Sequence, residues 1–291
     1  MDLISIENHE NTKLGSEDFQ FNIFRIKDLD TPPHWHNHSE IIYLQEGRAL
    51  IYINGSVNTC SEGDLLFIPS GHLHSIVTED SAQYHALVIG ERFLDDIRSD
   101  KHSNEILSPF FSESIKKSFH INRSDSSYSG IIKPIKSILN EENEGKPGFE
   151  LIIKIELCRF FTELIRNFPD RLAVGLEDEN RPVEKMKNVI EYIFVHFHEK
   201  ITISLMSNYS HMSDQHFCRV FKAYTGSTFI NFLTDYRLEQ ANQLLKSTDL
   251  PITNIPEITG FCNGNYFARV YKNKFGHPPS FLRKKNKNSI E

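Results

Sequence analysis

The chain of 291 residues is predicted to fold as an all-β barrel with appended helices, followed by an all-α domain of two helix-turn-helix units joined by a helix. Three observations predict this multidomain fold class. Short runs of alternating apolar and polar residues fill positions 19–90. Apolar residues at helical spacing replace them from position 91 onward. A ten-residue pattern then occurs twice near the C-terminus.

The composition is that of a globular protein, with 39% hydrophobic and 24% charged residues, which excludes a wholly disordered chain. The four cysteines are widely spaced and form no CxxC pair, which indicates reduced thiols rather than a disulfide frame or zinc site. No apolar run approaches the ~20 residues of a membrane helix, and residues 1–5 lack the features of a signal peptide. We therefore expect a cytoplasmic protein without a membrane partner.

Charge is distributed unevenly along the chain. Residues 182–291 contain 14 Lys and Arg against 9 Asp and Glu, a net charge of +5, and because the whole chain carries −7, the first 181 residues carry −12. A basic second part behind an acidic first part indicates that only the second part meets a polyanion such as DNA.

The predicted strands are separated by turn residues. Apolar and polar residues alternate over 21–26, 34–44, 48–53, 65–68, 72–77 and 84–89. Asn54 and Gly55 both tolerate positive φ and predict a type I′ hairpin after the third run. Many short antiparallel strands with such turns are typical of a barrel or sandwich, which we place at residues 1–90.

A helical segment is predicted over residues 91–168. Its strongest helix spans 149–168, where apolar residues recur at helical spacing at Leu151, Ile152, Ile155, Phe160, Leu164 and Ile165. Further apolar residues extend around much of its circumference, so we expect the helix to be covered on more than one side. Two interpretations remain open: it packs only on its own barrel, or it also packs against a second subunit as a dimerisation and coupling element.

A polar linker is predicted over residues 169–181, which contain Pro and Gly and show no sustained period. Pro182 stands where a helix would begin, because the N–H that proline lacks has no partner at that position. Residues 182–291 then form the all-α domain.

An internal repeat defines this domain. Residues 217–226 recur as 267–276, with Phe, Arg, Val, an aromatic residue, Lys and Gly in register. Together with the short apolar helix that precedes each copy, the repeat predicts helix-turn-helix units at about 203–224 and 252–274.

Each unit has the signals of a tight turn and a helix start. The turn falls at His211 in the first unit and at Gly260 in the second, where Gly is free to take positive φ. Ser213 and Asn263 then stand where the second helix needs an N-cap.

The second helix of each unit is predicted to present a polar face to DNA. Gln, Asn and Arg side chains pair bidentately with base edges, and Lys suits phosphate. The candidate DNA-binding residues are Ser213, Gln215, His216, Cys218, Arg219 and Lys222 in the first unit and Asn263, Asn265, Arg269 and Lys272 in the second.

One amphipathic helix is predicted between the units, over residues 229–246. A rigid helix of about 18 residues spans ~27 Å, close to one turn of DNA at ~34 Å. Both second helices can therefore enter successive segments of the major groove, and double-stranded DNA with repeated half-sites is the predicted partner.

These residues resemble the DNA-binding domain of the AraC/XylS family of bacterial transcription regulators. The matching positions are Arg237-Leu238, Ala241, Leu244-Leu245, Ile255, Gly260-Phe261, Tyr266-Phe267, Arg269-Val270-Tyr271-Lys272, Phe275-Gly276 and Pro279. The resemblance covers about the last 100 residues and implies transcription control at promoters. It places Gln215, Arg219, Asn265 and Arg269 where the family contacts bases.

Two residues depart from the family pattern. Pro256 stands where a small helical residue is usual; with Thr253 as N-cap it falls at the third helical position and costs no hydrogen bond, and otherwise it kinks the helix. Gly264, at the start of the second recognition helix, offers no side chain to a base. We therefore expect the first unit to discriminate more between DNA sequences.

Histidines and a glutamate gather in two stretches of the β region. His34, His36 and Glu40 share strand parity and are expected to point into the barrel, and His74 on a neighbouring strand would complete a set that can hold a transition metal. The two stretches resemble the cupin motifs, which implies a cupin, or jelly-roll, sensor barrel. Thr78 stands where the second motif usually has Asn.

Three interpretations of this cluster remain open: a catalytic metal site, a metal site that takes part in sensing, and a metal-free pocket or structural polar cluster. The candidate metal ligands are His34, His36, Glu40 and His74, and the candidate effector-pocket residues are these four with Trp35, Tyr43 and Tyr52. The aromatic rings would suit stacking on a sugar or aromatic effector, and core packing explains them equally well.

No catalytic residue is predicted, because no GxGxxG, Walker A, GxSxG or HExxH motif occurs. We expect a homodimeric transcription regulator that responds to a small-molecule effector, such as a sugar or other metabolite, with RNA polymerase as a further partner. Two alternatives remain: a cupin metalloenzyme with a DNA-binding appendage, and a ligand-independent regulator controlled by a protein partner.

Overall fold

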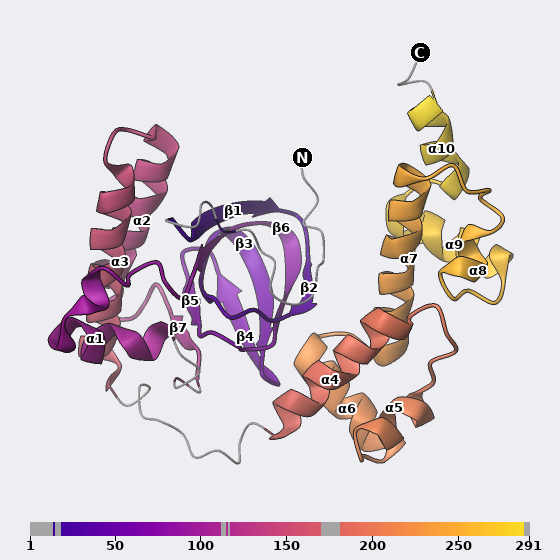
Figure 1. Cartoon of the computed structure of the whole chain (residues 1–291), viewed down its shortest axis with the longest axis horizontal. Coiled ribbons are helices and arrows are strands. Elements are labelled where there is room, and N and C mark those ends of the chain that lie inside the picture. The colour runs from indigo at the N-terminus through magenta and orange to yellow at the C-terminus, as the bar shows by residue number, and fades with distance from the viewer. Residues whose placement is uncertain (1–13, 15–18, 112–114, 116, 170–180, 288–291) are drawn as a thin grey trace. The chain divides into compact units, whose positions relative to one another are not determined.

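A computed structural model of the chain describes residues 14, 19–111, 115, 117–169 and 181–287. The chain divides into two compact units, Met1–Val183 and Glu184–Glu291 (Figure 1). The described part of the first unit contains a β-sheet with helices, and that of the second is all helical, so the predicted fold class is confirmed. None of the helices within the described ranges is long and apolar enough to cross a membrane.

The first unit is built on a seven-stranded sheet in which all neighbouring strands run antiparallel. Its main path follows the order β1-β6-β3-β5-β7, while β2 pairs with β6 and β4 pairs with β3. The strands are β1 (Phe21–Lys27), β2 (Thr31–His34), β3 (Ser39–Ile53), β4 (Ser56–Ser61), β5 (Leu65–Ile68), β6 (His74–Ile89) and β7 (Phe119–Ile121). Figure 1 shows these strands curving around a common interior.

Several predicted strands differ in extent from the observed ones. The run predicted over 34–44 is two strands, because β2 ends at His34 and β3 begins at Ser39. In the loop between them the His36 carbonyl accepts a hydrogen bond from the Gly71 N–H instead of joining a sheet ladder. The runs predicted over 72–77 and 84–89 are one long strand, β6.

The predicted type I′ hairpin is confirmed between β3 and β4. Asn54 and Gly55 have φ of 47° and 85°, and Ile53 pairs directly with Ser56. Asn54 is also tied to the loop before β6, since its side-chain oxygen accepts from the Leu73 N–H at 3.0 Å.

A bulge in β3 changes which residues face the interior. The register shifts between Leu44 and Arg48, so the inward-facing residues are Ile42 and Leu44 before the bulge and Ala49 and Ile51 after it. Gly47, within the bulge, has φ of 79°, and a Cβ there would lie 2.3 Å from the Ser81 carbonyl oxygen. Only glycine fits this close approach of two backbones.

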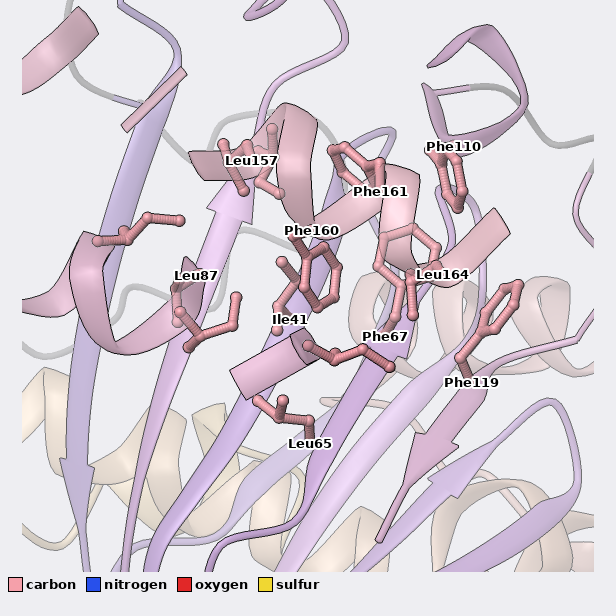
Figure 2. Close-up of a cluster of buried hydrophobic side chains, with 14 of the residues drawn as sticks. Ile41, Leu65, Phe67, Leu87, Phe110, Phe119, Leu157, Phe160, Phe161 and Leu164 are labelled. Carbon is pink, nitrogen blue, oxygen red and sulfur yellow. The ribbon is translucent and has the colours of Figure 1, made fainter. Parts of the chain in front are cut away.

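Both faces of the sheet are buried against apolar side chains. Residues such as Ile42, Ile51 and Tyr84 fill the interior. The other face packs against helices, and Figure 2 shows Ile41, Leu65, Phe67 and Leu87 of the strands beside Leu157, Phe160, Phe161 and Leu164 of α3. The elements of this layer are η1 (Ile97–Ser99), α1 (Lys101–Leu107), η2 (Ser108–Phe111), α2 (Tyr128–Glu144) and α3 (Phe149–Asn167). The sheet and these helices therefore share one core.

The buried face of α3 contains only part of the predicted stripe, since Phe160 and Leu164 are fully buried as predicted. Ile153, Leu157 and Phe161 are fully buried, whereas Leu151 and Ile155, two members of the predicted stripe, are 62% and 51% exposed. Because α3 is apolar around most of its circumference, its periodicity alone could not identify the face that meets the sheet. An apolar strip therefore remains on the outside of the helix.

The second unit contains the predicted pairs of helices. They are α4 (Arg181–His196), α5 (Ile203–Tyr209), α6 (Asp214–Thr225), α7 (Phe229–Ser247), α8 (Ile255–Ile258), α9 (Gly264–Phe275) and α10 (Pro279–Lys287), the first of which begins in the first unit. Pro182 lies at the start of α4, as predicted. Of the predicted linker 169–181, residues 170–180 lie outside the described residues.

The bulge in β3 gives a direct test of the barrel fold. Gly47→Ala is expected to destabilise the first unit by about 1–3 kcal/mol more than Gly145→Ala, because the added methyl group meets backbone atoms in the bulge. Gly145 is the matched control, since its φ is also positive, at 57°, and nothing lies within 4 Å of a Cβ built there. Urea unfolding followed by the fluorescence of Trp35, the single tryptophan, measures both variants. Equal losses would contradict this account of the bulge.

Candidate nucleic-acid interface and histidine cluster

The first helix-turn-helix unit has the geometry that its sequence predicts. His211 adopts a positive φ of 57° in the turn between α5 and α6. Ser213 caps α6, since its hydroxyl accepts a hydrogen bond from the His216 N–H at 3.3 Å. Gly226 ends α6 in the left-handed conformation with φ of 75°.

The second helix-turn-helix unit has the same arrangement with a shorter first helix. Asn263 caps α9 by accepting from the N–H groups of Asn265 and Tyr266 at 2.8 and 3.1 Å. Of the two possibilities left open for the start of α8, the N-cap is Asn254 rather than Thr253. Pro256 still lies in the first turn of α8, where no intrahelical N–H bond is lost.

Aromatic side chains fix both recognition helices, α6 and α9, on the single helix α7. Phe217 and Phe221 of α6 each lie within 5.6 Å, centroid to centroid, of Phe229 at the start of α7. Tyr271 of α9 packs beside Leu238 and donates a hydrogen bond to Asn242 of α7 at 2.7 Å. One face of each recognition helix is therefore buried within the all-helical part of the chain.

The opposite faces carry the predicted DNA-binding residues. Nine of them are exposed: Ser213, Gln215, His216, Arg219, Lys222, Asn263, Asn265, Arg269 and Lys272. Cys218 is half-buried. The two faces thus offer amide, guanidinium and ammonium groups at corresponding positions of the repeat.

An aromatic ring three residues earlier supports the arginine on each of these faces. Arg219 Nη2 donates to His216 Nδ1 at 3.0 Å, and the Arg269 guanidinium lies 5.5 Å from the centre of the Tyr266 ring. His216 and Tyr266 occupy equivalent positions in the two copies. Tyr266 was not predicted as a supporting residue, although alignment of the two copies places it at the position equivalent to His216.

A hydrogen-bonded arginine ties the end of α4 to α7. Arg237 Nε and Nη2 donate to the carbonyls of Phe197 and Glu199, each at 2.7 Å. Gly260 lies against the same group, and a Cβ there would be 2.5 Å from the Phe197 carbonyl oxygen. The turn of the second helix-turn-helix unit is thus held against Phe197, in the segment that precedes the first helix-turn-helix unit.

In the first unit of the chain, the structure brings the four predicted metal ligands together. His34 ends β2, His36 lies in the following loop, Glu40 is in β3 and His74 begins β6. Their ligand atoms all lie within 4.8 Å of one another. The prediction that His34, His36 and Glu40 share one strand is wrong, because the chain turns between His34 and Ser39; the cross-strand pair of His34 with His74 brings the groups together instead.

The three histidine rings are held in one tautomer by backbone carbonyls. Nδ1 of His34, His36 and His74 lies 2.9, 3.0 and 2.8 Å from the carbonyl oxygens of Pro32, His38 and His72, respectively. A carbonyl oxygen only accepts, so each Nδ1 donates its proton. The Nε2 atoms are left to face the cluster, with those of His74 and His36 at 2.9 and 3.4 Å from Glu40 Oε2.

The electrostatics of the cluster suit a cation. Burial, followed by the charges of His74 and His36, lowers the pKa of His34 to about 3. Burial alone would raise the pKa of Glu40, but the charge of His74 and hydrogen bonds from His36 and His74 bring that pKa below its ordinary value. Glu40 Oε2 and His74 Nε2 are both buried, and among the described residues they meet only polar atoms of the cluster itself. Three imidazole nitrogens and a carboxylate form a donor set for a divalent transition metal.

Two of the predicted pocket residues lie away from this cluster. Tyr43 is on the helix-covered face of β3, where its ring stacks on His85 at 6.1 Å, because its neighbours Ile42 and Leu44 point inward. Tyr52 lies between the inward-facing Ile51 and Ile53, so it points away from the interior. The expectation that Tyr43 and Tyr52 line one pocket with the histidines is therefore wrong. Trp35 is buried in the loop between β2 and β3, between His34 and His36 in the chain.

Family models match both units of the chain. A model of the AraC-like ligand binding domain matches residues 23–181, and a model of a helix-turn-helix domain matches residues 206–285. The first match alone spans more than half of the chain.

Named relatives are transcription regulators, not enzymes. The HTH-type transcriptional regulator YdeC of Bacillus subtilis (strain 168) is 25% identical over 260 residues, 88% of this chain and 87% of that protein. A regulator of Staphylococcus aureus (strain MSSA476) is 25% identical over 242 residues, 83% of this chain and 31% of that protein, so this chain spans about a third of its length. Among solved structures, the C-terminal domain of AraT, a response regulator from Geobacillus stearothermophilus, is 31% identical and covers 35% of this chain and 84% of that chain, with a TM-score of 0.34.

Proposed function

Because the chain belongs to the AraC family of DNA-binding transcription regulators with a ligand-binding domain, we propose that α6 and α9 contact bases at promoter half-sites under the control of a small-molecule effector. The observation that carries this proposal is the pair of exposed polar faces on two helices fixed to one rigid helix, α7. Because bacterial promoters lie in the cytoplasm, we propose that the protein acts there, with RNA polymerase as a further partner.

Base contacts are assigned to the long polar side chains of the two faces. Arg219 and Arg269 suit guanine, Gln215 and Asn265 suit adenine, and the lysines suit phosphates. The 19 residues of α7 correspond to about 28 Å, which matches the separation of neighbouring major-groove segments on one face of DNA.

The two helix-turn-helix units contribute unequally in this proposal. The second has a four-residue first helix, α8, where the first has seven residues in α5. Gly264 also supplies no side chain at the start of α9, where α6 has Asp214. We therefore propose that the first helix-turn-helix unit contributes more of the discrimination between DNA sequences.

A homodimer formed through α3 is the second part of the proposal. Leu151, Ile152 and Ile155 lie on adjacent positions of one helical face and are 62%, 36% and 51% exposed. Apolar side chains gathered in this way favour an apolar partner surface, and a second copy of α3 offers the same strip.

The histidine cluster is proposed to hold a divalent transition metal that takes part in sensing. His34, His36 and His74 would bind it through Nε2, and Glu40 through its carboxylate. The buried Glu40 Oε2 and His74 Nε2 support this assignment, because among the described residues neither makes a hydrogen bond outside the cluster and a bound cation would satisfy both atoms. Such a metal would supply open coordination positions to an oxygen or nitrogen ligand. Ile53 and Ile76, which neighbour His74 across and along the strands, fill the adjacent interior.

Arginine substitutions test the DNA contacts. Arg219→Ala is expected to weaken binding to a selected duplex by about 1–3 kcal/mol and to relax the preference at one base pair, whereas Arg269→Ala has a smaller effect. Fluorescence anisotropy at fixed salt with matched and substituted duplexes measures both. Arg123→Ala, in the first unit, is the control and leaves binding unchanged. If Arg219→Ala weakened all duplexes equally, its role would be phosphate contact rather than base recognition.

Elemental analysis of the purified protein tests the metal. About one transition-metal ion per chain is expected, and His74→Ala and Glu40→Gln should lower the metal affinity at least tenfold, because each removes a ligand. His102→Ala, an exposed histidine outside the cluster, is the control. A folded wild-type protein that holds no metal, in a preparation made without chelators, would contradict the proposal.

A charge on the apolar strip tests the dimer. Ile155→Asp should weaken self-association about 30-fold or more, which corresponds to the roughly 2 kcal/mol of an interface hot spot, because the interface would bury an unpaired carboxylate. Sedimentation equilibrium measures the change. Val57→Asp places the same charge on an exposed valine of β4 and should have no effect. A wild-type protein that is monomeric at micromolar concentration, or a variant that dimerises normally, would rule out this interface.

A further inference from the structure

A cavity beside the histidine cluster belongs to none of the sites described above. Its volume is about 250 Å³, and its walls are Gln20, Asn37, His38, Glu91 and Arg92. It adjoins the cluster through the loop between β2 and β3, since the His38 carbonyl accepts the hydrogen bond that orients His36. The rings of His36 and His38 are 5.6 Å apart.

Backbone contacts hold two walls of this cavity together. The Gly90 N–H donates to the Gln20 carbonyl at 2.8 Å. A Cβ on Gly90 would lie 2.5 Å from Gln20 Cβ, so the close approach of these two segments requires glycine. The cavity is thus framed by the segment before β1 and the segment after β6.

The walls offer groups of both charges. Glu91 and Arg92 are exposed, and neither forms an ion pair with any residue that the structure describes. Nδ1 of His38 is buried and has no hydrogen-bond partner among those residues. The walls of the cavity therefore include residues that carry a carboxylate, a guanidinium and an imidazole, and the His38 ring has hydrogen-bonding capacity unused among the described residues.

We propose that this cavity binds a small zwitterionic metabolite of the α-amino acid class, which acts as the effector. Its carboxylate pairs with Arg92, its ammonium group pairs with Glu91, and His38 hydrogen-bonds to the remaining polar atoms. The volume is just below the roughly 300–1,000 Å³ of drug-sized sites, which fits a molecule of this size. This inference rests on the proposed control of DNA binding by an effector.

A chain of contacts links the cavity to the proposed dimer helix. The Glu91 carbonyl accepts from Arg98 Nη2 at 2.8 Å, and the Arg98 guanidinium lies 4.9 Å from the centre of the Phe111 ring. Lys154 of α3 pairs with Asp96 at 3.1 Å and lies 5.6 Å from the ring centre of Phe93, the residue after Arg92. A ligand that reorients Glu91 and Arg92 therefore acts on the segment that supports α3.

Calorimetry with single amino acids tests the inference on the full-length protein. Each proteinogenic amino acid is titrated, together with the amine that lacks its carboxylate and the acid that lacks its ammonium group. At least one amino acid should bind, and its two singly charged analogues should bind at least about tenfold more weakly, because each loses one charge-assisted hydrogen bond. Arg92→Ala and Glu91→Ala should each cause a similar loss.

The matched controls are Glu62→Ala and Arg123→Ala, an exposed acidic and basic pair elsewhere in the first unit, which should bind the amino acid normally. Absence of binding across the panel, equal binding of an acid analogue, or normal binding by Arg92→Ala would overturn the inference. Binding of the same protein to a selected DNA duplex is measured in parallel. A protein that binds DNA but no amino acid contradicts this inference alone, whereas one that binds no DNA contradicts the proposed function.

Discussion

The aromatic contacts between the recognition helices and α7 determine which side chains the all-helical unit, Glu184–Glu291, presents to DNA. Phe229 receives Phe217 and Phe221 of α6, while the other end of α7 packs on Tyr271 of α9. Burying these rings stabilises the unit and, through the helical period, turns the polar side chains of both helices outward. Because one helix carries both contacts, the separation of the two polar faces is fixed by its length.

A similar constraint organises the first unit. Strand β3 is buried on both sides, so every shift of its register exchanges the interior for the helix-covered face. The bulge at Gly47 makes one such exchange. The loop before Ser39 places His36 beside Glu40, and the pairing of β6 with β2 and β3 places His34 and His74 there. The layer that covers the outer face ends in α3, whose remaining apolar strip is free for a second copy. In the function that we propose, sensing and dimerisation lie on opposite faces of one sheet.

The sequence alone predicted the second unit well, because its signals are local. Turn residues such as His211, caps such as Ser213 and the buried period of each recognition helix are set within a few residues. The first unit depends on contacts distant in sequence. Strand parity placed Tyr43 and Tyr52 beside the histidines, but the inward residues of β3 exclude both. The composition of α3 could not show which apolar face meets the sheet, and the cavity at Glu91 arises only where three separate segments meet.

We propose that two recognition helices on one rigid spacer contact successive major-groove segments of a single duplex. Protection of guanine N7 from methylation on a bound promoter fragment tests it most directly, since Arg219 and Arg269 are assigned to the major groove. Within each half-site we expect two protected clusters about 10 base pairs apart on one face of the DNA, with the stronger cluster beneath α6. A single cluster, or two clusters on opposite faces, would contradict it.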